Sequence, residues 1–119
     1  MATLIIYGYV NSDGSILQGS GFKVVQDDTG VYTVMFDQAS DGSDIFNDTP
    51  AVSVTQVYTG DMSYGGGDIT DNAVIIAIAQ DRVKILTGNV DNGHQDRQFS
   101  FIAAGPSDYA DIGVVPLAP

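Results

Sequence analysis

The chain of 119 residues contains no cysteine, no tryptophan and no glutamate. Without cysteine it can form neither a disulfide framework nor a thiolate metal site, and redox chemistry gives no indication of its compartment. Only four basic residues stand against fifteen acidic ones, so the formal net charge is -11. Such a charge disfavours a basic groove for phosphates and attraction to an anionic membrane. Nucleic acid and lipid are therefore not expected as partners.

Long apolar runs and helical patterns are also scarce. The longest apolar run, residues 73–79, has the length of a strand and is far shorter than the roughly 20 residues that span a bilayer. Residues 1–7 lack a basic stretch followed by a long apolar run, so no signal peptide is expected there. No segment repeats its apolar residues every 3.6 positions. The length predicts one domain over residues 1–119, with residues 110–119 as a tail or an edge strand.

All fifteen acidic residues are aspartates. The short aspartate side chain competes with the helical backbone for hydrogen bonds and favours turns, whereas glutamate favours helices. Here the aspartates stand beside glycine, asparagine, serine or threonine, as in residues 12–14, 27–30, 41–44 and 91–93. Short runs rich in Val, Ile, Tyr, Phe and Thr separate these clusters. The aspartates therefore mark the turns between β-strands.

The spacing of these turns predicts an all-β protein, an antiparallel β-sandwich of jelly-roll type with about 6–9 short strands. Residues 22–25 and 31–36 should form a hairpin, and the nearly all-apolar residues 72–79 should form a central strand buried on both faces. Val83 and Ile85 should face inward and Arg82 and Lys84 outward. Polar loops are expected at three places: residues 37–49, 59–70 and 88–96.

Two parts of the chain resemble known families. Gly21-Phe22-Lys23-Val24 and residues 30–36 and 50–55 resemble a small β-module of bacterial and phage proteins, often found at the ends of tail fibres. Residues 50–58, 71–85 and 93–105 are similar in layout to H-type lectin domains, with a strand after a proline, an apolar strand, a short turn, a third strand and a loop histidine. The resemblance implies a six-stranded sandwich that forms a homotrimer and binds galactose-type sugars near subunit boundaries. It also implies an extracellular or virion-associated surface location.

The resemblance carries few individual residues. His94 stands where H-type lectins have a loop histidine in the sugar site. Asp71-Asn72 stands where they have an arginine, and Asn72 could still bond a sugar hydroxyl. Phe99 and Phe101 stand where the family has a core tryptophan in its last strand.

Strand parity gives a second prediction for the site. Loops 59–70 and 88–96 flank a two-strand hairpin, so they should leave the sandwich from the same end, with loop 37–49 at the other. Tyr64 could stack on a sugar ring or fold back over the sheet edge. Arg97 should pair with Asp96, Asp91 or an aspartate of a neighbouring subunit. The candidate ligand-binding residues are Tyr64, Asp68, Asp71, Asn72, Asp91, His94, Asp96 and Arg97.

Catalysis is not expected. His94 is the one histidine, and no nucleophile signature adjoins it. Calcium is the metal that aspartate-rich loops would suit, but no EF-hand spacing is present, and solvated turn aspartates explain the same pattern. No cofactor and no metal site are predicted. Two functions remain open: a non-catalytic structural or adhesive module of a phage fibre, virion or surface assembly, and an H-type-lectin-like carbohydrate-binding protein. The partners would be copies of the chain itself, a cell-surface glycan or other fibre proteins.

Overall fold

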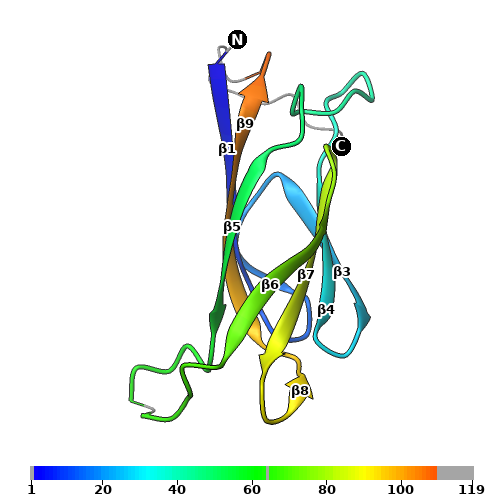
Figure 1. Cartoon of the computed structure of the whole chain (residues 1–119). Coiled ribbons are helices and arrows are strands. Elements are labelled where there is room, and N and C mark those ends of the chain that lie inside the picture. The colour runs from blue at the N-terminus through cyan, green and yellow to red at the C-terminus, as the bar shows by residue number, and fades with distance from the viewer. Residues whose placement is uncertain (1, 64, 110–119) are drawn as a thin grey trace.

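The computed structural model describes residues 2–63 and 65–109, so the predicted tail at residues 110–119 lies outside the described residues. Within the described part all regular structure is β, and no helix there is long and apolar enough to cross a membrane. The strands, drawn in Figure 1, are β1 (Ala2–Val10), β2 (Ile16–Gly19), β3 (Phe22–Asp28), β4 (Val31–Phe36), β5 (Ala51–Val57), β6 (Asn72–Ile78), β7 (Arg82–Asn89), β8 (Gly93–His94) and β9 (Gln98–Ser107).

The strands form two antiparallel sheets that pack face to face (Figure 1). Sheet A has the order β2-β1-β9-β5, and sheet B has the order β3-β4-β7-β6, with the short β8 paired to β7. The predicted all-β architecture of two antiparallel layers is confirmed. The predicted hairpin is also present, since Lys23 pairs with Met35 and Val25 with Thr33 across β3 and β4.

Aromatic side chains join the two sheets in the core. Phe22 of sheet B meets Phe101 of sheet A edge to face, with ring centroids 4.9 Å apart and planes at 82°. Tyr32 of sheet B lies 5.1 Å from Phe99 of sheet A. Val83 and Ile85 are fully buried as predicted. Such ring pairs contribute about 0.5–1.5 kcal/mol beyond the area they bury.

Gly8 of β1 makes the Phe22–Phe101 contact possible. It faces the core in register with Phe101, and a Cβ there would lie 2.3 Å from Cζ of Phe22 and 2.9 Å from Cε1 of Phe101. These distances are shorter than van der Waals contact, so any side chain at position 8 would displace a ring.

Loop 37–49 is not the purely polar loop that the sequence predicts. Ala39, Ile45 and Phe46 are buried, and Phe46 packs edge to face on Phe36 at 5.1 Å. The open end of a sandwich exposes its core, and this loop folds Ile45 and Phe46 over that end. The prediction was wrong here because single apolar residues in a polar segment carry no periodicity.

The prediction for residues 72–79 was also wrong. β6 is an edge strand that pairs only with β7, and Val74, Ile76 and Ile78 are each roughly half exposed. The ladder shifts register between Ile75 and Ala77, and such a bulge is a common way to keep an edge strand from pairing with another chain.

Three turns share one bonding pattern, Asp-Xaa-Ser. In each, Oδ1 of the aspartate accepts hydrogen bonds from both the backbone N and the Oγ of the serine two residues on. The N–O and O–O distances are 2.9 and 2.6 Å for Asp13 with Ser15, and the same for Asp41 with Ser43; for Asp61 with Ser63 they are 2.9 and 2.7 Å. These bonds hold the pKa of each carboxyl below its ordinary value, the serine hydroxyl being the largest cause.

Replacing Gly8 by alanine should destabilise the fold. Over-packing a filled core costs about 1–3 kcal/mol, and thermal unfolding followed by circular dichroism would measure it. Gly65→Ala is the matched control, because a Cβ at Gly65 meets nothing within 4 Å. Equal melting temperatures for the two variants would contradict the role of Gly8.

The Asp-Xaa-Ser turns predict a pH effect. A carboxyl whose pKa is lowered on folding stabilises the fold above its ordinary pKa, and this contribution is lost as pH falls through the folded value. Titration of the Asp13 carboxyl by nuclear magnetic resonance should give a pKa below about 3.9. In Ser15→Ala the pKa of Asp13 should rise, while those of Asp41 and Asp61 should stay unchanged. An unmoved Asp13 pKa would contradict the assignment.

Candidate functional site

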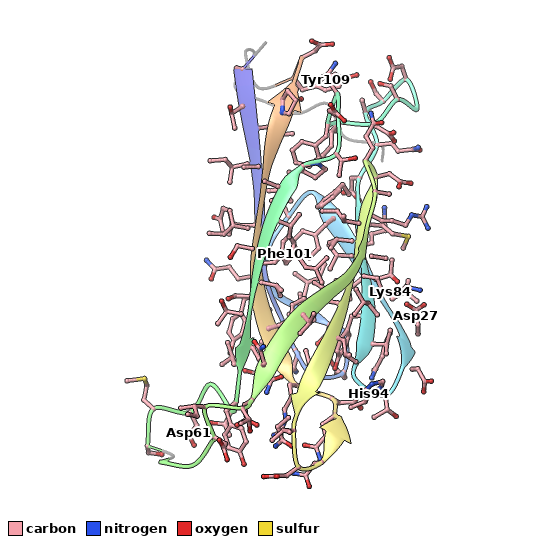
Figure 2. The ribbon with its side chains drawn as sticks, in the orientation of Figure 1. Asp27, Asp61, Lys84, His94, Phe101 and Tyr109 are labelled. Atoms are coloured by element: carbon pink, nitrogen blue, oxygen red, sulfur yellow. The ribbon has the colours of Figure 1, made fainter. Side chains whose placement is uncertain are left out.

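Loops 59–70 and 88–96 do leave the sandwich from the same end. In Figure 2 Asp61 and His94, one from each loop, both lie toward the lower end of the sandwich, whereas Tyr109 lies at the upper end. Loop 37–49 lies beside Tyr109, since the hydroxyls of Ser43 and Tyr109 are 2.8 Å apart. This follows from the tight β6–β7 connection at the upper end, where the backbone N of Ala79 donates to the carbonyl of Arg82 at 2.8 Å. The strand-parity prediction is confirmed for the described parts of these loops.

Two of the predicted residues, Asn72 and His94, line one pocket. Asn72 pairs with Gly88 on one side and His94 pairs with Gly88 on the other. Gly88 has φ 152°, and a Cβ there would lie 2.0 Å from the carbonyl oxygen of Gly93. Glycine is therefore required for β8 to close on β7. The pocket has a volume of about 190 Å³ and is lined by Thr70, Asn72, Val74, Leu86, Thr87, Gly88, Asn89, Gly93 and His94.

Asp71 and Asp68 form the base of the protruding loop. Asp71 accepts a hydrogen bond from Nδ2 of Asn89 at 3.0 Å and another from the backbone N of Asp68 at 2.7 Å. The Asn89 bond is the largest cause that lowers the pKa of Asp71, and the charge of Arg97 adds a smaller effect. Asp68 accepts the backbone N of Thr70 at 3.0 Å. Asp71 thus ties the loop to β7, which leaves its carboxylate less available to a ligand.

Asp96 lies beside the β3–β4 turn, away from Asn72. Its Oδ1 accepts the backbone N of Gly30 at 2.8 Å and Nε2 of Gln26 at 2.6 Å. Through these hydrogen bonds Asp96 links the segment after β8 to the β3–β4 hairpin. Sequence spacing could not reveal these partners, which lie 66 and 70 residues away.

Arg97 does not pair with Asp96 or Asp91 in the described chain. Its guanidinium carbon lies 4.7 Å from the centroid of the Tyr58 ring, a cation–π geometry, and Nη2 donates to Gln95. The hydrogen bonds of Asp96 go to Gly30 and Gln26, through its Oδ1. The prediction that Arg97 pairs with Asp96 or Asp91 of its own chain was wrong. Its partner there is the ring of Tyr58.

The described residue Asp91 does not line the pocket. Asp91 is exposed in the turn between β7 and β8, and Tyr64 lies outside the described residues. Two contributors were missed. Asn89 lines the pocket, and Gln56 faces inward, where its Oε1 accepts the backbone N of Gly88 at 2.9 Å. Val52 and Val54 face inward, and side chains two residues apart on a strand share a face. The same alternation would have placed Gln56 on the inward face.

Among the described residues no group of three or more histidine, aspartate or glutamate side chains could hold a metal ion. The surface of the pocket is mostly apolar, with Val74 and Leu86 in its lining beside the side chains of Asn72 and His94. The Thr87 hydroxyl and the Asn89 amide are bonded within the chain. Such a lining suits a small ligand with hydroxyl groups and one apolar face.

A second candidate site is the outer face of sheet A. None of the residues in β1, β2, β5 and β9 is charged, although the whole chain carries a net charge of -11. Every charged residue that lies on a strand belongs to sheet B. At the centre of the face Tyr7 is in register with Ile102, and Ile102 with Ser53.

This face is apolar as well as uncharged. Ile5, Tyr7 and Ile102 are 58%, 55% and 56% exposed. Ile5 is in register with Ala104, and Ala104 with Ala51, so small side chains flank the large ones. The polar groups at the centre of the face are the uncharged side chains of Tyr7 and Ser53. We call this surface the uncharged face: the outward side chains of β1, β5 and β9.

The chain matches no protein-family model, and no curated protein or solved structure is significantly similar to it. The Asn72–His94 pocket and the uncharged face are therefore the two features on which a function can be built.

Proposed function

We propose that the protein is a non-catalytic structural or adhesive module that assembles with copies of itself through the uncharged face, as a homotrimer. The observation that supports this is the separation of charge: the four strands of sheet A carry none, and three of their outward apolar side chains are more than half exposed. Contiguous apolar surface of this kind is typical of protein–protein contacts.

The charge of the chain decides which surface can meet a second copy. Burying an unpaired carboxylate is strongly unfavourable, and fifteen aspartates against four cations leave most carboxylates without a basic partner. Two copies therefore approach best through a face that carries no aspartate. The uncharged face meets this condition over its whole width.

The size of the face is that of a small interface. A strand of nine residues is about 30 Å long and the three strands of the face are about 14 Å wide, on the order of 430 Å² per copy. Two such faces together come close to the roughly 1,000 Å² expected of a specific interface. The resemblance to fibre-end modules, which are trimeric, supports the same assembly and a place in a phage fibre, virion or surface structure.

Static light scattering tests this assembly. The wild-type chain should give a mass near three times its 12.5 kDa at micromolar concentration. Tyr7→Asp and Ile102→Asp should each give the monomer, because a carboxylate would be buried without a partner. Val90→Asp is the matched control, since it adds the same charge at an exposed position outside sheet A. A monomeric wild-type protein would rule out the proposal.

Carbohydrate binding is the second candidate, and the Asn72–His94 pocket favours it. The two side chains come from strands on opposite sides of Gly88 and line one cavity. His94 is the residue that the resemblance to H-type lectins places in a sugar site. An imidazole and an amide together can donate to and accept from a sugar hydroxyl.

A glycan array tests this candidate. Binding should be saturable, and His94→Ala and Asn72→Ala should each abolish most of it. The melting temperature should hardly change, because exposed substitutions usually alter stability by less than about 0.5 kcal/mol. Gln18→Ala, on an exposed strand of sheet A, should bind like the wild type. Absence of binding to every glycan would exclude the lectin function and leave the structural one standing.

A further inference from the structure

The turn between β7 and β8 holds the one asparagine of the chain that is followed by glycine, Asn92-Gly93. Both residues are exposed. Glycine has no Cβ to hinder an approach to its backbone nitrogen, so an asparagine before glycine loses its side-chain amide more easily than any other. The turn adjoins the Asn72–His94 pocket, because Gly93 and His94 line that pocket.

The side chain of Asn92 is the free one among the asparagines that the structure describes. The other four asparagine side chains each take part in hydrogen bonds: Asn11, Asn47, Asn72 and Asn89. The backbone N of Asn92 donates to Oδ1 of Asn89 at 2.7 Å, but its side chain makes no hydrogen bond with a described residue. The backbone bond holds the turn in place, and the Asn92 amide can still rotate toward the next residue.

The backbone nitrogen of Gly93 lies at the end of a very short ladder. β8 pairs with β7 through two residue pairs, Gly88 with His94 and Asn89 with Gly93. Strand ends with few buried contacts open locally at a small cost in free energy, and each opening leaves this nitrogen free to react. A Cβ on Gly93 would meet nothing within 4 Å, so no neighbouring group crowds the glycine.

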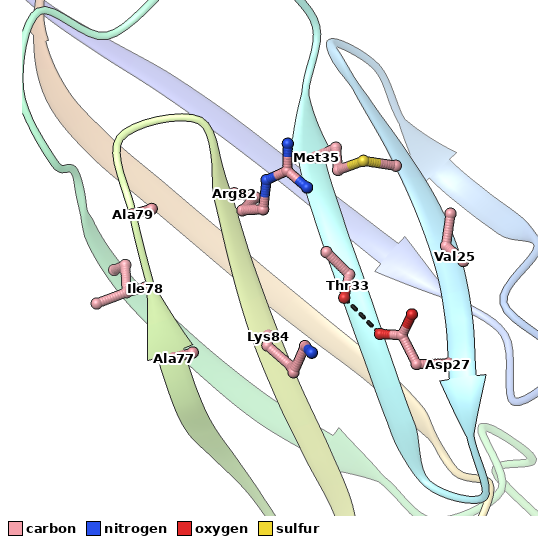
Figure 3. A pocket seen from close by; sticks show the side chains of 9 residues that line it. All are labelled: Val25, Asp27, Thr33, Met35, Ala77, Ile78, Ala79, Arg82 and Lys84. Atoms are coloured by element: carbon pink, nitrogen blue, oxygen red, sulfur yellow. Dashed lines mark hydrogen bonds between the residues drawn. The ribbon is translucent and has the colours of Figure 1, made fainter.

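Aspartate before glycine reacts by the same route, but both such aspartates are protected. In Asp13-Gly14 and Asp41-Gly42 the glycine N donates at 2.9 Å to a backbone carbonyl earlier in the turn. The serine bonds of these turns hold the pKa of both carboxyls below its ordinary value, and an ionised carboxylate resists attack by a nitrogen. Asp27, on a strand, is followed by aspartate and accepts a hydrogen bond from Oγ1 of Thr33 (Figure 3). Asn92 therefore differs from these side chains in being both unbonded and followed by glycine.

We propose that Asn92 is a site of spontaneous deamidation. The backbone N of Gly93 attacks Cγ of Asn92: an N–Cγ bond forms, the Cγ–Nδ2 bond breaks, and Nδ2 leaves as ammonia with the proton of the attacking nitrogen. Water then opens the resulting succinimide ring. Cleavage of the new N–Cγ bond gives aspartate, and cleavage of the original peptide bond gives isoaspartate. Water is the co-reactant, no atom is oxidised or reduced, and neither step depends on self-assembly or on carbohydrate binding.

The products change the turn in two ways. Both place a carboxylate beside the Asn72–His94 pocket, and isoaspartate also inserts a methylene group into the main chain before Gly93. The strands are already in close contact there, since a Cβ on Gly88 would lie 2.0 Å from the carbonyl oxygen of Gly93. The lengthened chain therefore separates β8 from β7 and moves His94 out of the pocket. The lifetime of the pocket is set by the lifetime of the Asn92 amide.

Peptide mapping by mass spectrometry tests the site. The folded wild-type chain is kept at neutral pH and sampled over weeks, with a sample from the first day as the reference. Trypsin releases residues 85–97, which contain both Asn89 and Asn92. Fragmentation of this peptide should show aspartate and isoaspartate accumulating at position 92, while Asn89 stays an amide. Conversion should be faster at higher pH, because the attacking nitrogen must lose its proton.

Asn92→Gln is the matched variant, because the longer side chain would have to close a larger ring, and it should stay unmodified over the same time. An Asn92 that stays intact in the folded chain, or conversion of Asn89 at an equal rate, would overturn the proposal.

Hydrogen exchange tests the consequence for the pocket. The aged chain, separated from the unreacted chain by anion exchange, should exchange the backbone amides of residues 93–95 faster than the fresh chain. Asn92→Asp adds the same charge without lengthening the main chain, so its amides should exchange as in the wild type. Equal exchange in the aged and fresh chains, or equal acceleration in Asn92→Asp, would contradict the separation of β8 from β7.

Discussion

The contact between Phe22 and Phe101 is the interaction on which the two layers depend, because one ring comes from each sheet and they meet at 4.9 Å. It exists only because residue 8, opposite Phe101 on the neighbouring strand, has no side chain. Tyr32 of β4 and Phe99 of β9 make a second ring contact between the sheets, with ring centroids 5.1 Å apart. This packing of aromatic rings sets the distance between the two sheets. The positions of the outward faces and of the loops at each end depend on that distance.

The core contains uncharged residues, so the charged side chains lie on the surface. They are distributed unevenly there. Sheet A carries none on any strand. Sheet B has cations on β3 and β7, of which Lys23 forms an ion pair with Asp37 and Arg82 with Asp81. The remaining carboxylates lie mainly in the turns and loops. The molecule thus has one uncharged sheet, a second sheet that carries both cations and carboxylates, and acidic ends.

Much of the fold could be predicted from local pattern. Alternation on β7 identified the inward residues Val83 and Ile85 correctly, and strand parity placed the long loops. The failures have a common cause. The edge position of β6, the burial of Phe46 and the Asp96 clamp on Gly30 all depend on partners distant in sequence. Of the candidate residues that the structure describes, Asn72 and His94 alone line one pocket, because polar residue type does not distinguish a ligand contact from a hydrogen bond within a turn.

The aspartates connect the composition to the surfaces. In the Asp-Xaa-Ser turns one carboxylate oxygen accepts both serine donors, and this requires a side chain short enough to reach back to its own turn. Glutamate would carry the same charge but would not close these turns with the same geometry. By tying negative charge to turn formation, the chain keeps the strands of sheet A free of carboxylates. The outer face of sheet A can therefore contact another copy without burying a carboxylate, and this follows from the same residues that end the strands.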